Sequence, residues 1–290
     1  MKYIVFSDPH ITDSSIQELE EIFTEISSTG GDSLICLGDY YDKLKPSPKE
    51  ILFGTEWAYK FKQKFNQVVF IKGNLGNHGN CGEFTNLDYL QFLGITLLDT
   101  YTLENKVHFI HAMANKSKTC YDIFHIKVSD LIPYTYTLIG HQHMFQDIEA
   151  NIVHLGSCRW VNMGEACDKE KYIATIENDK VSFIPLKTPI KIIEVNNVLD
   201  LNTIPNRTKI YYKINSFEQL KDEINMLDKI KTNFYEFRIK LNFTEKPVQT
   251  NTVSTSKPKV SNILSNWLNN IEDEDVKKEL KEEFTKYTLC

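Results

Sequence analysis

Short apolar runs alternate with polar loops through the first half of the chain. Five runs have the length of a strand and end on a polar motif: 2–7, 33–37, 67–71, 106–110 and 135–139. Apolar residues at helical spacing follow Ser14, and a second helical stretch follows Pro48. This order of strand, polar loop, helix and strand predicts an α/β fold built in layers.

The second half of the chain follows a different pattern. Residues 171–186 predict an antiparallel hairpin that turns at Asn178 and Asp179. A separate β-α-β unit comes next, with strands at 208–214 and 234–243 and a helical stretch at 217–231. These elements predict a small α+β domain that follows the larger one.

The last part of the chain is polar and then amphipathic. Residues 245–259 are rich in Thr and Ser and contain no aromatic side chain, which is typical of a flexible linker. Apolar residues then recur at helical spacing and predict a pair of helices. We therefore expect four parts: an α/β domain at 1–200, the small α+β domain at 205–244, the linker at 245–259 and a helical segment at 260–290.

Composition excludes several classes of protein. The 290 residues are 41% hydrophobic and 25% charged, as in an ordinary soluble protein. A net charge of −6 argues against an overall basic nucleic-acid-binding protein, but it allows a local basic groove. The six cysteines show no CxxC spacing, so no cysteine-zinc site is expected. No apolar run approaches the roughly 20 residues of a transmembrane helix and no signal peptide is evident, so we expect a cytoplasmic protein without a membrane partner.

Acidic, amide and imidazole side chains gather where the predicted strands end. They are Asp8 and His10, Asp39, Asn77 and His78, His111, and His141 with His143. Five of the eight histidines belong to this set, whereas His108, His125 and His154 do not fall directly at a strand end. Ligands of open α/β sheets bind at the carboxyl ends of the strands, so we expect these side chains to converge.

Each motif alone has an ordinary structural interpretation as a turn, a helix cap or a hydrogen-bonded strand end. The Gly140–His143 motif is the most specific, because extended backbone points residues i and i+2 to the same side. Together the motifs offer carboxylate, carboxamide and imidazole ligands. This mixed set suits two divalent cations such as Mn²⁺, Mg²⁺ or Fe²⁺.

The order of the motifs resembles that of the calcineurin-like metallophosphoesterases. Asp-x-His, Gly-Asp-x-x-Asp, Gly-Asn-His, a lone His and Gly-His-x-His follow one another over about half the chain. The resemblance implies a layered β-sandwich flanked by helices, with a centre of two divalent metal ions, Mn²⁺ foremost. It implies seven metal ligands: Asp8, His10, Asp39, Asn77, His111, His141 and His143.

The resemblance also implies a role for each residue. Asp39 would bridge the two ions. One site would be completed by Asp8, His10 and His143, and the other by Asn77, His111 and His141. Two further residues would support catalysis without binding metal: His78 would face the phosphate, and Asp42 would steady a ligand.

A second resemblance bears on the substrate. The segment 156–186 is similar to the one that closes the catalytic domain of SbcD-type nuclease subunits, through Gly156-Ser157, Arg159, Gly164-Glu165 and Lys171-Tyr172. This implies a DNA nuclease subunit in which residues 205–244 help to position DNA. It also implies that residues 260–290 bind an SbcC-type coiled-coil ATPase, in DNA end processing, repair or recombination.

Two other functions remain open on the sequence. One is a stand-alone phosphodiesterase that acts on cyclic nucleotides or other small phosphoesters. The other is a non-catalytic scaffold with a structural metal site. We also expect a homodimer, for which the helical stretches at 47–65 and 85–95 are the candidate faces.

Overall fold

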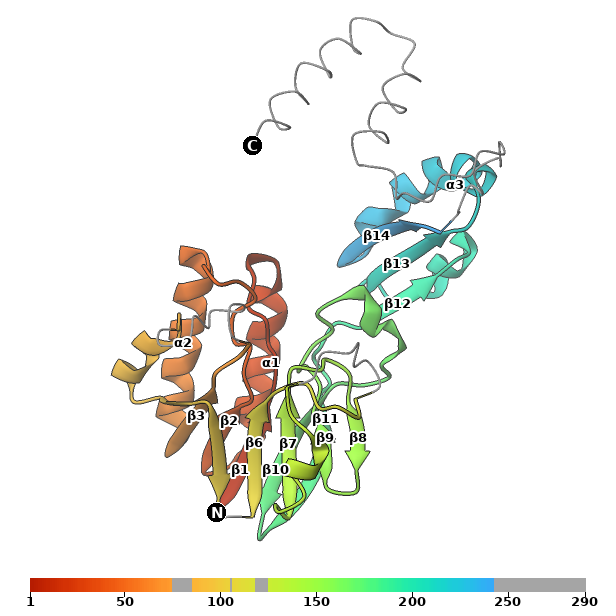
Figure 1. Ribbon diagram of the computed structural model, residues 1–290. Coiled ribbons are helices and arrows are strands. Elements are labelled where there is room, and N and C mark those ends of the chain that lie inside the picture. Colours follow the sequence, from red (N-terminus) through yellow and green to blue (C-terminus); the bar gives the residue numbers. More distant parts are fainter. Residues whose placement is uncertain (75–84, 105, 118–124, 243–290) are drawn as a thin grey trace, which may run out of the picture. The chain divides into compact units, whose positions relative to one another are not determined.

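The computed structural model (Figure 1) describes residues 1–74, 85–104, 106–117 and 125–242. These residues all belong to one compact unit. The expected linker at 245–259 and the helical segment at 260–290 lie outside the described residues. None of the helices in the described part of the chain has the length and apolar character needed to cross a bilayer.

The first sheet has six strands in the order β11-β10-β1-β2-β3-β4. Its strands are β1 (Lys2–Phe6), β2 (Ser33–Cys36), β3 (Gln67–Ile71), β4 (Thr96–Leu98), β10 (Tyr172–Glu177) and β11 (Lys180–Pro185). Strands β1 to β4 run parallel, whereas β10 is antiparallel to both of its neighbours. The predicted hairpin is confirmed, because Asn178 and Asp179 both have positive φ and turn β10 into β11.

The second sheet has five strands in the order β5-β6-β7-β9-β8. Its strands are β5 (Thr100–Leu103), β6 (Val107–His111), β7 (Tyr136–Gly140), β8 (Gln146–Glu149) and β9 (Ile152–His154). The central strands β6, β7 and β9 run parallel. Their carboxyl ends therefore lie at one edge of this sheet, as those of β1, β2 and β3 do in the first sheet.

The two sheets pack face to face, and the alternation of side chains along the strands explains how. Ile4 and Phe6 point to one face of the first sheet, where they join a core with α1 (Ile16–Ser28) and α2 (Pro48–Lys64). Val5 points to the other face and joins a core shared with Phe109 of the second sheet. Strands buried on both faces are expected in a parallel sheet covered by helices. The predicted layered α/β fold is thus confirmed (Figure 1).

Helix starts follow the local sequence. The side-chain hydroxyl of Ser47 accepts a hydrogen bond from the Glu50 amide, and the Glu50 carboxylate accepts one from the Ser47 amide, which forms a capping box ahead of Pro48. Helix α1 follows the short 3₁₀ helix η1 (Asp13–Ser15). Five further 3₁₀ helices occur in the described residues: η2 (Asp88–Leu93), η3 (Val128–Asp130), η4 (Met163–Cys167), η5 (Val198–Thr203) and η6 (Lys231–Asn233).

A third sheet is small and parallel. It consists of β12 (Ile192–Val195), β13 (Lys209–Ile214) and β14 (Glu236–Leu241), and α3 (Phe217–Ile230) connects the last two strands. The predicted β-α-β unit is therefore present. Strand β12 lies inside the range 1–200 that the sequence assigns to the first domain, yet it pairs with β13. The sheet thus begins before residue 205.

The third sheet is tied to the first domain by a buried cluster of charges. The Lys209 ammonium on β13 donates to the Glu18 carboxylate of α1 at 2.6 Å. The Arg159 guanidinium lies 3.7 Å from the same carboxylate. Arg159 also donates to the backbone carbonyls of Pro9 and His10, both at 2.8 Å. A single chain of contacts therefore runs from β13 to the loop that carries Asp8 and His10.

Candidate metal centre

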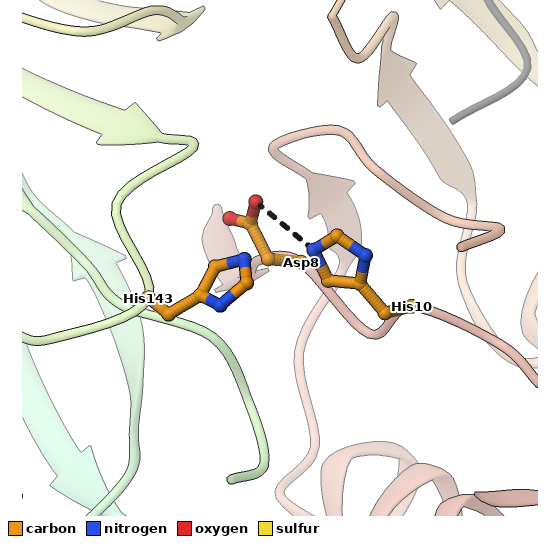
Figure 2. A group of neighbouring side chains, drawn as sticks. All are labelled: Asp8, His10 and His143. Atoms are coloured by element: carbon orange, nitrogen blue, oxygen red, sulfur yellow. Dashed lines mark ion pairs between the residues drawn. The ribbon is translucent and has the colours of Figure 1, made fainter. Parts of the chain in front are cut away.

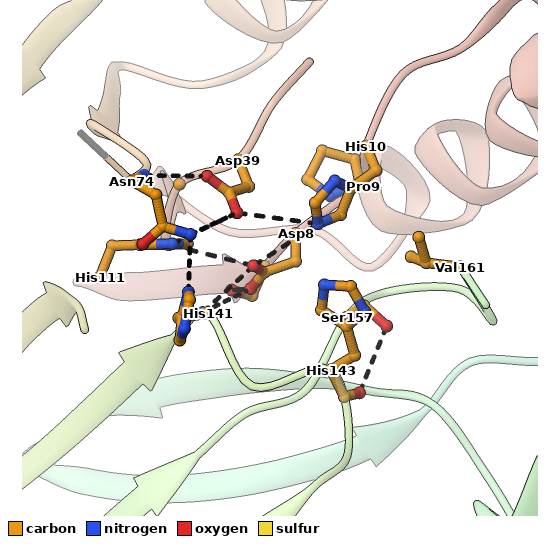
Figure 3. A network of polar contacts seen from close by, with 12 residues as sticks. Asp8, Pro9, His10, Asp39, Asn74, His111, His141, His143, Ser157 and Val161 are labelled. Atoms are coloured by element: carbon orange, nitrogen blue, oxygen red, sulfur yellow. Dashed lines mark hydrogen bonds and ion pairs between the residues drawn. The ribbon is translucent and has the colours of Figure 1, made fainter. Parts of the chain in front are cut away.

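The loops after five parallel strands meet at one place (Figure 3). The loop after β1 carries Asp8 and His10, the loop after β2 carries Asp39, and the loop after β3 carries Asn74. His111 is the last residue of β6, and His141 and His143 follow β7. Since strands of both sheets end at this edge, side chains up to 135 positions apart are brought together, as the strand-end pattern predicts.

The first group of ligand atoms comes from Asp8, His10 and His143 (Figure 2). One ligand atom of each side chain lies within 4.8 Å of the other two. Nε2 of His10 is 3.9 Å from Oδ1 of Asp8, and the two imidazole rings have centroids 4.6 Å apart. The sequence assigned these three residues to one site, and the fold brings them together.

The second group consists of Asp39, His111 and His141, again with one ligand atom each within 4.8 Å of the others. Nε2 of His111 lies 3.3 Å from Oδ2 of Asp39. This buried ring nitrogen makes no hydrogen bond to any described residue. A buried imidazole nitrogen that faces a carboxylate without a hydrogen bond is suited to a metal ion.

Asp39 lies between the two groups. Its Oδ2 atom is 3.8 Å from Nε2 of His10 in the first group and 3.3 Å from Nε2 of His111 in the second. A carboxylate that bridges two cations requires this position. The bridging role expected of Asp39 has support in the geometry, and it stays a prediction until ions are counted.

Four of the candidate ligands have left-handed, strained backbone. Seven non-glycine residues in the described ranges have positive φ, and four of them are Asp8, His10, Asp39 and His141, with φ of 49°, 46°, 45° and 88°. Left-handed backbone costs about 1–3 kcal/mol for each residue that is not glycine. Such strain persists only where the surrounding structure imposes it, and it is commonly found at functional sites. The sharp turns occur in the loops that carry the ligands, at the edge where the strands end.

Two glycines give the ligands room. A Cβ atom on Gly73 would lie 1.9 Å from Oδ1 of Asp39, and one on Gly38 would lie 2.4 Å from Nδ1 of His111. Gly38 also has a φ of 112°, which side chains rarely permit. The Gly-Asp motif therefore requires glycine at position 38, because any side chain there would displace the His111 imidazole.

Carboxylates support both imidazoles of the first group. Nδ1 of His10 lies 3.2 Å from Oδ1 of Asp42, and Nδ1 of His143 lies 3.0 Å from Oε1 of Glu165. Asp42 thus contacts a ligand, as the sequence predicts. A carboxylate on one ring nitrogen fixes the orientation of the ring and makes the other nitrogen a stronger metal ligand. Burial lowers the pKa of His10, which favours the neutral, metal-binding form.

Glu165 is held by a buried cation. The Lys171 ammonium donates to Oε2 of Glu165 at 2.7 Å and to Asp168 at 2.7 Å. Burial alone would raise the pKa of Glu165, but hydrogen bonding to His143 and the charge of Lys171 lower it to about 2. Glu165 is therefore ionised at neutral pH. The sequence noted Glu165 and Lys171 only through their resemblance to a nuclease segment and did not connect them with His143.

In the second group, His111 is held by a neutral backbone carbonyl and not by a carboxylate. Nδ1 of His111 donates to the backbone carbonyl of Leu37 at 2.8 Å, which leaves Nε2 to face Asp39. Burial opposes the charged form of His111, but Asp39 and Asp8 raise its pKa to about 9. Burial and the neighbouring His111 lower the pKa of His141 to about 3. Asp39 and Asp8 thus favour a positive charge at this position, which a bound divalent cation would supply.

Asn74 is a candidate ligand that the motif did not single out. Its side-chain nitrogen lies 2.7 Å from Nδ1 of His141 and 3.4 Å from Oδ2 of Asp39, and its backbone amide donates to Oδ1 of Asp39 at 3.1 Å. Its carboxamide therefore lies beside the second group, with its nitrogen directed at Asp39 and His141. Asn77 and His78, the expected amide ligand and phosphate-facing histidine, lie outside the described residues.

The variant Glu165→Gln tests the support of the first group. The amide keeps the shape of the side chain but loses the charge that orients His143, so we expect the affinity for one of two Mn²⁺ ions to fall about 10- to 100-fold. Calorimetric Mn²⁺ titration measures this, with Glu177→Gln, an exposed site on β10, as the control. Two Mn²⁺ ions bound with unchanged affinity would contradict the role.

Comparison with known proteins agrees with this geometry. The calcineurin-like phosphoesterase family profile matches residues 1–160, which is more than half of the chain. The chain therefore belongs to the calcineurin-like phosphoesterase family, whose members are metal-dependent phosphoester hydrolases with a dinuclear metal centre. Its two groups of candidate ligands fit such a centre. A search of curated proteins finds none that matches the chain.

Solved structures show likeness at low identity. YfcE, a phosphoesterase from E. coli, is 18% identical with a TM-score of 0.33, over 63% of this chain and 91% of that one. Vps29 from Chaetomium thermophilum is 12% identical with a TM-score of 0.36, over 65% and 100%. A single mutant of Vps29 from Entamoeba histolytica is 12% identical with a TM-score of 0.37, over 64% and 100%. Likeness of this degree does not bear on the substrate.

Proposed function

We propose that the protein hydrolyses phosphodiester bonds of DNA as the nuclease subunit of a complex with an SbcC-type coiled-coil ATPase. The position of Asp39 between two groups of ligand atoms carries the hydrolase part of this proposal. The substrate rests on a second observation. Arg159, Glu165 and Lys171, which carry the nuclease resemblance, all contact the metal centre or the loop that forms it.

Each part of the centre has a distinct task in this reaction. Bound divalent cations would supply a nucleophilic water at neutral pH and neutralise phosphoryl charge. Asp8, His10 and His143 would hold one ion, and Asp39, His111 and His141 the other, with Asp39 shared and an amide oxygen from Asn77 or Asn74 completing the second site. Asp42 and Glu165 keep two imidazoles in a fixed orientation. His78 is the residue we expect to face the phosphate.

A stand-alone phosphodiesterase for small phosphoesters is the second candidate. Lys43 follows the Gly-Asp motif and Lys116 follows His111, so both would flank bound DNA. Lys43 is paired with Glu50 at 3.5 Å, and Lys116 is paired with Glu149. Each pairing reduces the positive charge offered to a DNA backbone. The pairing of these two lysines favours a small substrate. It also fits a nuclease that binds DNA weakly until the ATPase adds its own DNA contacts.

The partner proposals concern two surfaces. Residues 260–290 would bind the ATPase as amphipathic helices laid on a groove. A homodimer would use α2 and η2, where Leu52, Tyr59 and Phe92 have exposed fractions of 61%, 53% and 93%. Sedimentation of the full chain, alone and with an SbcC-type ATPase, tests both surfaces. A monomer that does not co-sediment with the ATPase would refute both.

One assay separates the candidate functions. The protein is incubated with Mn²⁺ and labelled single- or double-stranded DNA, beside bis-p-nitrophenyl phosphate and a cyclic nucleotide. We expect DNA to be cleaved, and cleavage to stop when a chelator removes the metal, because the metal ions would activate the attacking water and neutralise the phosphoryl charge. Hydrolysis of the small esters alone would support the second candidate. Hydrolysis of none would leave a scaffold with a structural metal site.

A further inference from the structure

His125 lies beside the second group of ligands although it follows no strand. The backbone amide of His125 donates to the carbonyl of Met113 at 2.8 Å, and Ala114 and Ile126 form a parallel bridge. These contacts fix His125 next to the loop that leaves β6. Its ring centroid is 5.4 Å from that of His141. The imidazole is nevertheless exposed.

One ring nitrogen of His125 is used within the protein. The backbone amide of Met113 donates to Nδ1 of His125 at 3.2 Å. A nitrogen that accepts a hydrogen bond carries no proton, so the neutral ring has its proton on Nε2. His125 thus presents an N–H donor on its other edge. The two contacts with Met113 hold the imidazole by its backbone and by its ring, which pre-organises that donor.

His125 is not a member of the ligand group beside it. The side chains whose ligand atoms lie within 4.8 Å of one another are Asp39, His111 and His141, and His125 is absent from both groups found among the described residues. His125 is also exposed, whereas the grouped ligands are buried or half-buried. An imidazole that is fixed at the rim of a metal centre, outside the coordination sphere, is placed to contact a molecule bound there.

We infer that His125 is a substrate-contacting residue, whose Nε2–H donates a hydrogen bond to a non-bridging phosphoryl oxygen of the phosphoester. The inference rests on the proposed phosphoester hydrolysis. It gives His125 a role in binding the phosphoryl group, which neither the motifs nor the family profile assigns to it. Hydrogen bonds to an anionic oxygen are stronger than those between neutral groups, so one fixed donor has a measurable effect.

Two substitutions distinguish the two edges of the ring. His125→Asn keeps an acceptor near the position of Nδ1 but removes the donor at Nε2. His125→Gln places an amide N–H near the position of Nε2. For Mn²⁺-loaded His125→Asn we expect kcat/KM for a phosphodiester to fall about 10- to 100-fold, and the dissociation constant of inorganic phosphate to rise about 10-fold. His125→Gln should recover part of both losses.

Calorimetry with inorganic phosphate supplies the readout that does not depend on turnover. Metal content and thermal unfolding midpoint should match the wild type in both variants, which excludes lost metal or lost fold as the cause. Unchanged phosphate affinity in His125→Asn would overturn the inference, as would a wild type that binds no phosphate. A wild type that binds phosphate but cleaves no phosphodiester would instead refute the proposed function.

Discussion

Asp39→Asn is expected to abolish binding of at least one metal ion and to reduce phosphodiester hydrolysis about a thousandfold or more. The amide keeps the shape of the side chain, so the change isolates the charge. Two cations held close together need an anion between them, and removing it withdraws several kcal/mol of stabilisation from the transition state. Oδ2 of Asp39 is the carboxylate oxygen near both His10 and His111.

Metal analysis of the purified variant checks this result directly. Ions are counted after dialysis against Mn²⁺ and compared with the wild type and with Asp130→Ala, an exposed acid on η3. Asp39→Ala, which has no polar side chain, should lose metal more completely than Asp39→Asn. If Asp39→Asn retains two ions and full activity, Asp39 does not bridge.

The second large effect is expected for Asn74→Ala, with about a 100-fold or greater loss of hydrolysis. The side-chain nitrogen of Asn74 lies 3.4 Å from Asp39 and 2.7 Å from His141, and we expect the carboxamide oxygen to supply a neutral ligand to the second site. The first group has separate support from Asp42 and Glu165 and should keep its ion. We therefore expect one Mn²⁺ per chain instead of two.

Asn77→Ala is the matched comparison, since Asn77 is the amide that the Gly-Asn-His motif indicates. If Asn74 is the ligand, Asn77→Ala should retain two ions. The reverse result, in which only Asn77→Ala loses an ion, would restore the assignment made from the motif. Equal loss in both variants would mean that each contributes to the second site.

The sequence contains three Gly-Asn pairs within eight residues, 73–74, 76–77 and 79–80, so it offers more than one candidate for the amide ligand. Gly73-Asn74 comes two residues after β3, which ends at Ile71, and Gly76-Asn77 follows three residues later. The presence of His78 favoured the second pair. The rule that ligands stand at strand ends favours the first. Local pattern cannot resolve them, because the position of Asn74 is decided by contacts with Asp39 and His141, which are distant in the sequence.

The strands and the convergence of most candidate ligands were predictable for a physical reason. The run at 67–71 matches β3, and Asp8, Asp39 and His111 stand where buried parallel strands end. A short run of apolar residues predicts a buried strand. The carboxyl ends of parallel strands share one edge of the sheet, so side chains that follow these strands converge there. The residues that support the ligands follow no such rule. Glu165 lies 22 positions after His143 in an isolated 3₁₀ turn, and only the folded chain brings it to the imidazole.

The contact between β13 and α1 limits how far the protein can be shortened. Glu18 and Lys209 are almost completely buried, with side-chain exposed fractions of 0% and 5%. A truncated chain that ends before β12 would leave the Glu18 carboxylate without its ammonium partner, with the Arg159 guanidinium, 3.7 Å away, to compensate its charge. Arg159 would then be drawn towards Glu18 and away from the carbonyls of Pro9 and His10. Engineered minimal versions of this enzyme should therefore retain the three-stranded sheet, even if the reaction under study needs nothing that it binds.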